Sequence, residues 1–163
     1  MRESPTSCLT LTSDASWDPE TGIAAWAFQA VSDGFRHRAA GTFKTALESS
    51  HRAEVCAIGN AAHLLNKLRP QPVRLVVINV DCKSAMLRLA DPRQDFERYV
   101  LHHLAQLMVT LGGARYELRW VKAHTTGRRG QRAREVVNNQ CDKAARAELR
   151  KALRERAKYE QPF

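Results

Sequence analysis

Four acidic residues lie at positions where the negative charge of a carboxylate needs a compensating partner. Asp14 and Asp81 each end a stretch that predicts a strand. Glu54 falls in the first turn of an expected helix, and Asp142 in the first half of another. Burying carboxylates costs free energy, and neighbouring carboxylates raise one another's pKa. Divalent cations relieve both costs: oxygen-only ligands suit Mg²⁺ or Mn²⁺, and two ions about 3.5–4 Å apart can promote phosphodiester cleavage.

The hydrophobic periodicity of the chain predicts the elements that would carry these acids. Strands are expected over residues 7–14, 23–31, 34–44, 73–80 and 115–121, and helices from about 50 to the residue before Pro70, over 83–89, over 95–111 and over about 134–157. Short turns join the first three strands, as in an antiparallel meander. The run 73–80 is apolar almost throughout, which suits parallel pairing with both faces covered. The predicted order is βββαβααβα, an α/β structure with a mixed sheet.

Each acid taken alone also has a structural explanation. Asp14 could be a turn residue, and Glu54 or Asp142 could be a helix-terminus or solvated charge. The agreement of element order and local context at all four positions favours a shared site.

Length and composition indicate one ordinary globular domain. The chain has 163 residues, and we expect a single domain over 1–163. A hydrophobic fraction of 44% and a charged fraction of 26% argue against a disordered or collagen-like chain. No stretch reaches the about 18 apolar residues of a membrane span, and the first residues do not resemble a signal peptide. Four scattered cysteines without metal-ligand spacing predict free thiols and a cytoplasmic protein.

The positive charge is concentrated in the last quarter of the chain. Residues 115–158 hold 14 Lys or Arg against five Asp or Glu, which equals the whole formal net charge of +9. A basic face of this kind attracts polyanions, chiefly nucleic acid. An Arg-rich solvated helix is the alternative at this point.

The motifs around the acids resemble those of the ribonuclease H type 1 family, over essentially the whole chain. The family's TDGS-like, NNRME-like, TDS-like, WVKGH-like and N-x-x-x-D motifs are matched by TSDAS at 12–16, SHRAE at 50–54, VDC at 80–82, WVKAH at 120–124 and Asn138 with Asp142. The order of the four acids, the WVKAH segment and the closing motif together make the resemblance specific.

The resemblance implies an RNase H-like five-stranded mixed sheet, with three antiparallel strands followed by two parallel ones. It also implies Mg²⁺-dependent endonucleolytic cleavage of the RNA strand of an RNA–DNA hybrid, with Mn²⁺ as a substitute. Asp14, Glu54, Asp81 and Asp142 would hold two metal ions, and His124 would assist proton movement or product release. The residues that would contact the hybrid are Ser16, Ser49, Ser50, Arg52, Lys122, Arg128, Arg129 and Asn138. RNA would be distinguished from DNA through its 2′-hydroxyls.

Some departures from the family concern the residues that would contact the hybrid. Ser50 and His51 replace the two asparagines before the arginine, although serine hydroxyls can still bind phosphate. Some relatives carry a basic handle helix between the two middle helices, and here that region is only residues 90–93. We expect the arginines of the loop after His124 and the basic last helix to supply that charge, with surface solvation as the alternative.

Two other functions stay open on the sequence alone. One is a related metal-dependent nuclease of the same fold, and the other is a noncatalytic nucleic-acid-binding domain. The WVKAH segment and the spacing of Asn138 and Asp142 favour the hybrid-specific enzyme, and the presence of all four acids disfavours the noncatalytic domain. A monomer is the expected oligomeric state.

Overall fold

The computed structural model describes residues 6–122 and 132–160. The strands are β1 (Thr6–Trp17), β2 (Ala24–Ser32), β3 (Phe35–Thr42), β4 (Val73–Val80) and β5 (Arg115–Trp120). The helices are α1 (Ser50–Leu68), α2 (Lys83–Ala90), α3 (Asp95–Thr110) and α4 (Ala133–Tyr159).

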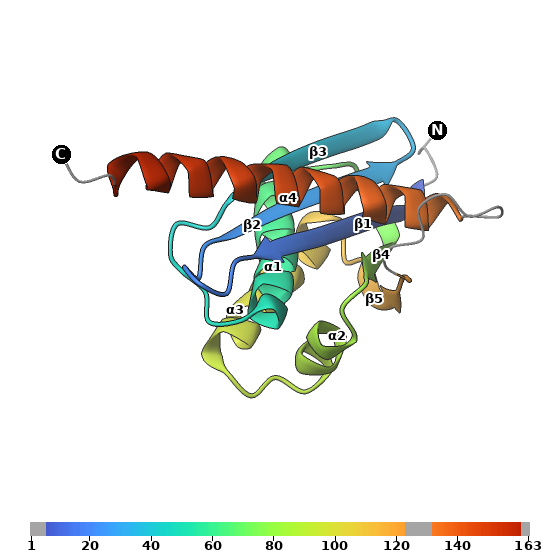
Figure 1. The fold of residues 1–163 in the computed structure, drawn as a ribbon. Coiled ribbons are helices and arrows are strands. Elements are labelled where there is room, and N and C mark those ends of the chain that lie inside the picture. Colours follow the sequence, from blue (N-terminus) through green and yellow to red (C-terminus); the bar gives the residue numbers. More distant parts are fainter. Residues whose placement is uncertain (1–5, 123–131, 161–163) are drawn as a thin grey trace.

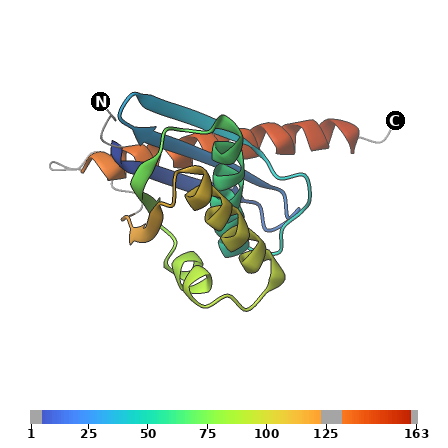
Figure 2. The same ribbon diagram turned by 180° about the vertical axis from the view of Figure 1, so that it is seen from behind.

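The five strands form one mixed sheet in the order β3-β2-β1-β4-β5. Pairing is antiparallel between β1 and β2 and between β2 and β3, whereas β4 runs parallel to β1 and to β5. Helix α4 crosses one face of the sheet over β1 and β2, and α1 with α3 covers the opposite face (Figures 1 and 2). The central strands are therefore buried between two helical layers, as the apolar run 73–80 predicts.

Successive side chains of a strand point to opposite faces of the sheet, so those of the central strands point alternately toward the two helical layers. Leu9 and Leu11 of β1 join Ile78 of β4 in the core beneath α1 and α3. The next residues along these strands, Thr12 and Asn79, are also buried and bond to each other, with Asn79 Nδ2 donating to Thr12 Oγ1 at 3.2 Å. Polar groups thus lie deep within the sheet, two residues before Asp14 and Asp81.

The structure confirms the predicted element order and the mixed sheet. Ser49 caps α1, because its side chain accepts from the Arg52 backbone N–H at 3.3 Å. All four cysteines are free. Within the described residues, none of the helices combines the length and apolar character needed to cross a membrane.

Two positional predictions were wrong. Asp14 does not end β1, because antiparallel pairing with β2 extends the strand to Trp17. Glu54 does not lie in the first turn of α1, because the helix begins at Ser50 and places Glu54 in the second turn. The first difference comes from the pairing partner, which extends the strand beyond its local hydrophobic pattern. The second does not, because the helix begins where it was expected and Glu54 is simply its fifth residue.

Candidate active site

The register of two parallel strands brings Asp14 and Asp81 together. The ladder between β1 and β4 ends where Thr12 pairs with Asn79. Two residues further along each chain come Asp14, which is still paired with β2, and Asp81, directly after β4. Side chains two apart on a strand share a face, so Asp14 lies on the same face as Thr12. Asp81 lies just beyond the end of β4, close enough for its charge to raise the pKa of Asp14.

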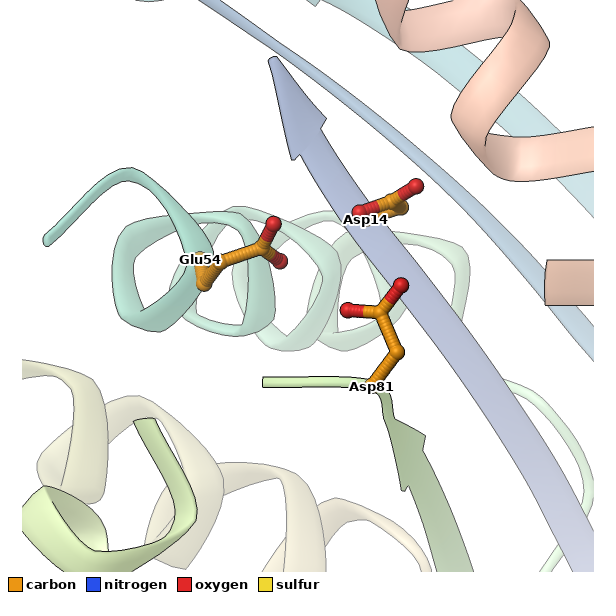
Figure 3. A group of neighbouring side chains, drawn as sticks. All are labelled: Asp14, Glu54 and Asp81. Carbon is orange, nitrogen blue, oxygen red and sulfur yellow. The ribbon is translucent and has the colours of Figure 1, made fainter. Parts of the chain in front are cut away.

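Glu54 joins this pair from α1. One carboxylate oxygen from each of Asp14, Glu54 and Asp81 lies within 4.8 Å of the others. The three side chains converge from the central strand β1, from the chain just after β4 and from helix α1 (Figure 3). Three elements that are distant in sequence therefore build a single acid cluster.

Burial and mutual repulsion shift the titration of this cluster. Burial, followed by the charge of Asp81, raises the pKa of Asp14 from 3.8 to about 8. Burial, followed by the charges of Asp14 and Asp81, raises the pKa of Glu54 well above its usual range. A cluster of this kind holds protons at neutral pH unless another cation replaces them.

The oxygens of the cluster fit a divalent cation. Asp14 Oδ2 and Glu54 Oε2 are shielded from solvent and have no hydrogen-bond partner within the described residues. Such oxygens are unfavourable when buried alone, whereas Mg²⁺ and Mn²⁺ prefer carboxylate ligands. The donor set and the unpartnered oxygens together make this a metal-compatible site.

Asp81 is held in place by two neighbours. Asn138 of α4 donates through Nδ2 to Asp81 Oδ2 at 3.1 Å. The indole N–H of Trp120, at the end of β5, donates to the Asp81 backbone carbonyl at 3.2 Å. Asn138 is 1% exposed, so the structure gives this predicted hybrid contact a position inside the protein beside Asp81. Trp120 was absent from the predicted site residues, although its place as the first residue of the WVKAH motif, which also holds Lys122 and His124, was an available signal.

Asp142 lies near the cluster but does not belong to the group of three. Its charge contributes to raising the pKa of Asp14, which places it within electrostatic reach. Its Oδ1 accepts from Arg146 Nε at 2.8 Å, one turn further along α4. This ion pair was not predicted, although the i, i+4 spacing of an acid and an arginine was its sequence signal.

The other predicted contact residues differ in their exposure and in their partners. Ser16 is half-buried on β1, Ser50 is exposed at the start of α1, and Lys122 is exposed after β5. Arg52 pairs with Glu48 at 3.0 Å. His124, Arg128 and Arg129 lie outside the described residues.

Comparisons with known proteins concern the architecture. No protein-family model matches the chain, and neither does any curated protein. RNase H1 from the halophilic archaeon Halobacterium salinarum NRC-1 matches with a TM-score of 0.60 at 15% sequence identity, covering 89% of this chain and 99% of that chain. The N-terminal RNase H domain of Rv2228c from Mycobacterium tuberculosis, solved as a fusion with maltose-binding protein, matches with a TM-score of 0.62 at 12% identity and coverages of 92% and 99%.

The chain has the ribonuclease H fold. The strand order and the pattern of parallel and antiparallel pairs fit that fold, so the predicted fold class is confirmed. Within the fold, the acid cluster lies where β1, β4 and α1 meet. At these identities the likeness shows the architecture, and the chemistry has to be argued from the residues of this chain.

Proposed function

We propose that this protein is an endoribonuclease of the ribonuclease H type 1 family that hydrolyses the RNA strand of RNA–DNA hybrids. The observation that carries the proposal is the convergence of Asp14, Glu54 and Asp81, with two buried oxygens that have no other partner among the described residues. The resemblance of the five motifs and the ribonuclease H fold support the same function.

The roles that we propose are supported by the acid cluster and by the resemblance of the motifs. Asp14, Glu54 and Asp81 would hold divalent cations, and Asp142 would complete the set by exchanging its contact with Arg146 for a metal. Two bound cations supply an activated water and stabilise the charge on the leaving oxygen. Asn138 orients the Asp81 carboxylate by donating to one of its oxygens. His124 would accept or deliver a proton, since an unperturbed imidazole titrates at about pH 6.5.

Substrate recognition is proposed to depend on backbone contacts. The hydroxyls of Ser16, Ser49 and Ser50 and the charge of Lys122 would bind sugar or phosphate groups near the cluster. Arg128 and Arg129 would add charge contacts with the phosphates. The 2′-hydroxyls would identify the RNA strand.

The decisive experiment measures cleavage of four labelled substrates. RNA–DNA hybrid, RNA duplex, DNA duplex and single strands are incubated with the protein, with Mg²⁺ or with EDTA. We expect Mg²⁺-dependent internal cuts in the RNA of the hybrid alone. Asp81→Asn should bind the hybrid but not cut it, whereas Asp33→Asn, an exposed acid in the turn between β2 and β3, should retain activity.

The alternative functions give different results in the same assay. Cleavage that prefers DNA or RNA duplex would indicate a related nuclease of this fold. Hybrid binding without cleavage in either Mg²⁺ or Mn²⁺ would indicate a noncatalytic binding domain. Full activity of Asp81→Asn would refute the assignment of the acid cluster.

A further inference from the structure

One carboxylate of the acid cluster is carried by neither a strand nor a helix. Asp14 lies within β1, where it pairs with Ala27 of β2, and Glu54 lies in the second turn of α1. Asp81 follows the last residue of β4, and α2 begins only at Lys83. A side chain on a strand or a helix is positioned more precisely than one on a connection. The position of Asp81 therefore depends on contacts from outside its own segment.

The backbone pairing of β4 ends before Asp81 on both sides of the strand. The ladder with β1 ends at Asn79, and the ladder with β5 ends where Val80 pairs with Trp120. The last pair of the second ladder thus sets Trp120 opposite the residue directly before Asp81. From this position, the Trp120 side chain can reach one residue further along the neighbouring chain.

The Trp120 side chain continues the contact between the two segments beyond the end of the ladder. Its indole N–H donates to the Asp81 backbone carbonyl at 3.2 Å. Lys83 Nζ lies 4.5 Å from the centroid of the same ring, within the about 6 Å of a cation–π contact. Trp120 therefore contacts the residues on both sides of Cys82 and ties the connection between β4 and α2 to β5.

Asp81 is held by its side chain and by its backbone. Asn138 of α4 donates to the carboxylate oxygen Oδ2 at 3.1 Å, and Trp120 donates to the backbone carbonyl. The first bond limits rotation of the side chain, and the second fixes the backbone from which that side chain extends. Together they direct the carboxylate toward Asp14 and Glu54 (Figure 3).

Hydrophobic packing does not explain the position of Trp120. The residue is 42% exposed, and it is not among the partly buried side chains that pack against the main core of the described residues. Large aromatic side chains stabilise proteins mainly through the area that they bury, and an exposed ring gives up much of that contribution. What this side chain provides is directed contact with Asp81 and Lys83.

We propose that Trp120 is a positioning residue of the metal site, which acts by fixing the backbone of Asp81 through its indole N–H. In this role Trp120 binds neither the metal nor the substrate. The inference rests on the proposed function, because it treats the acid cluster as a cation site. Hydrogen-bond partners that orient metal ligands usually contribute about 10–100-fold to metal affinity or activity.

Calorimetric titration with Mn²⁺ in the absence of nucleic acid tests the inference through metal affinity alone. Trp120→Phe removes the indole N–H and keeps an aromatic ring beside Lys83. We expect the Mn²⁺ affinity of this variant to fall by about tenfold, the lower end of that range, because the lost bond is to the backbone and not to the carboxylate. Urea unfolding in EDTA measures whether the variant is folded, and a variant that no longer folds would give Trp120 a structural role and overturn the inference.

Trp17→Phe is the matched control, because it removes the same kind of bond elsewhere. The indole N–H of Trp17 donates to the Leu47 backbone carbonyl at 2.9 Å, and Leu47 is not part of the acid cluster. The Mn²⁺ affinity of this control should equal that of the wild type. Equal affinity of Trp120→Phe and the wild type, or equal loss in both tryptophan variants, would overturn the inference and leave the acid cluster in place.

A second measurement separates this inference from the proposed function. In the hybrid cleavage assay, Trp120→Phe should need about tenfold more Mg²⁺ for half-maximal turnover, with an unchanged KM for hybrid. A raised KM with an unchanged Mg²⁺ requirement would make Trp120 a substrate contact and overturn the inference. Weaker Mn²⁺ binding by Trp120→Phe in a protein that does not cut hybrid would support the inference and refute the enzyme. Equal Mn²⁺ affinity of Asp81→Asn and the wild type would refute both.

Discussion

Replacing Asp14 by asparagine should stabilise the metal-free protein while it removes a metal ligand. In the folded chain, burial and the charge of Asp81 raise the pKa of Asp14 from 3.8 to about 8. The folded protein therefore holds a proton that the unfolded chain has already released. Stability consequently falls as pH rises through this window, by about 1.4 kcal/mol for each pH unit.

The size of this destabilisation follows from how far the pH lies above the ordinary pKa of Asp14. At pH 7, about three units above the ordinary pKa, the Asp14 carboxyl costs the folded state about 4 kcal/mol. Asparagine has no charge to bury, and its amide oxygen can still accept from the Ala15 N–H, as Asp14 Oδ1 does at 2.9 Å. We expect Asp14→Asn to raise the free energy of unfolding at pH 7 by about 2–4 kcal/mol, since the amide is itself polar and buried.

Urea unfolding in EDTA, followed by tryptophan fluorescence from pH 4 to pH 8, measures this effect. The gain in the free energy of unfolding should shrink as the pH is lowered. It should vanish near pH 4, where the Asp14 carboxyl of the wild type is protonated in both the folded and the unfolded state. Added Mg²⁺ should stabilise the wild type, by about 2.7 kcal/mol at 100 times its Kd, and should act much less on Asp14→Asn. Asp33→Asn, at an exposed position, should change neither the pH dependence nor the Mg²⁺ response of the free energy of unfolding. A variant that is less stable than the wild type at pH 8, or a gain that does not depend on pH, would refute the reasoning.

The remaining predictions concern His124, the arginines that follow it and the helix crossing. His124→Ala should lower turnover on hybrid by about 10²–10⁴-fold while hybrid affinity and Mg²⁺ requirement stay unchanged; wild-type turnover would make the histidine a bystander. Replacing Arg128 and Arg129 with alanine should reduce the log–log salt slope of hybrid binding by about 0.9 for each lost phosphate contact, and an unchanged slope and affinity would mean that these arginines are only solvated. Gly59→Ala should destabilise the protein by about 1–3 kcal/mol in urea unfolding, because its Cβ would meet Val100 Cγ2 at 2.8 Å. Adding Val100→Ala to that variant should restore part of the space, and a wild-type midpoint for Gly59→Ala would contradict the close crossing.

Much of the fold could be predicted because its signals are local. The β-branched run 73–80, the turn residues between the first strands and the apolar spacing along α1 and α3 each specify one element without reference to the rest. The errors lie at boundaries. Antiparallel pairing with β2 carries β1 past Asp14, and a strand cannot reveal from its own residues how far its partner extends.

The sequence predicted which residues form the candidate site better than it predicted how these residues are arranged. Asp14, Glu54 and Asp81 do converge, as the motif contexts suggested. The sequence did not show that Asn138 is buried against Asp81, or that Arg146 is bonded to Asp142. The i, i+4 spacing allowed that ion pair, but spacing alone cannot decide which of several nearby partners a carboxylate takes.

The sequence by itself determined the residue types, their order and the elements on which they lie, because periodicity and turn chemistry act over a few residues. The tertiary structure alone decided which carboxylates face one another. Asp14 and Asp81 meet because β1 and β4 pair in the register that sets Thr12 opposite Asn79. The burial that raises the pKa of Asp14 likewise comes from segments that lie far from it in the sequence. These properties belong to contacts between distant segments, and no local pattern contains them.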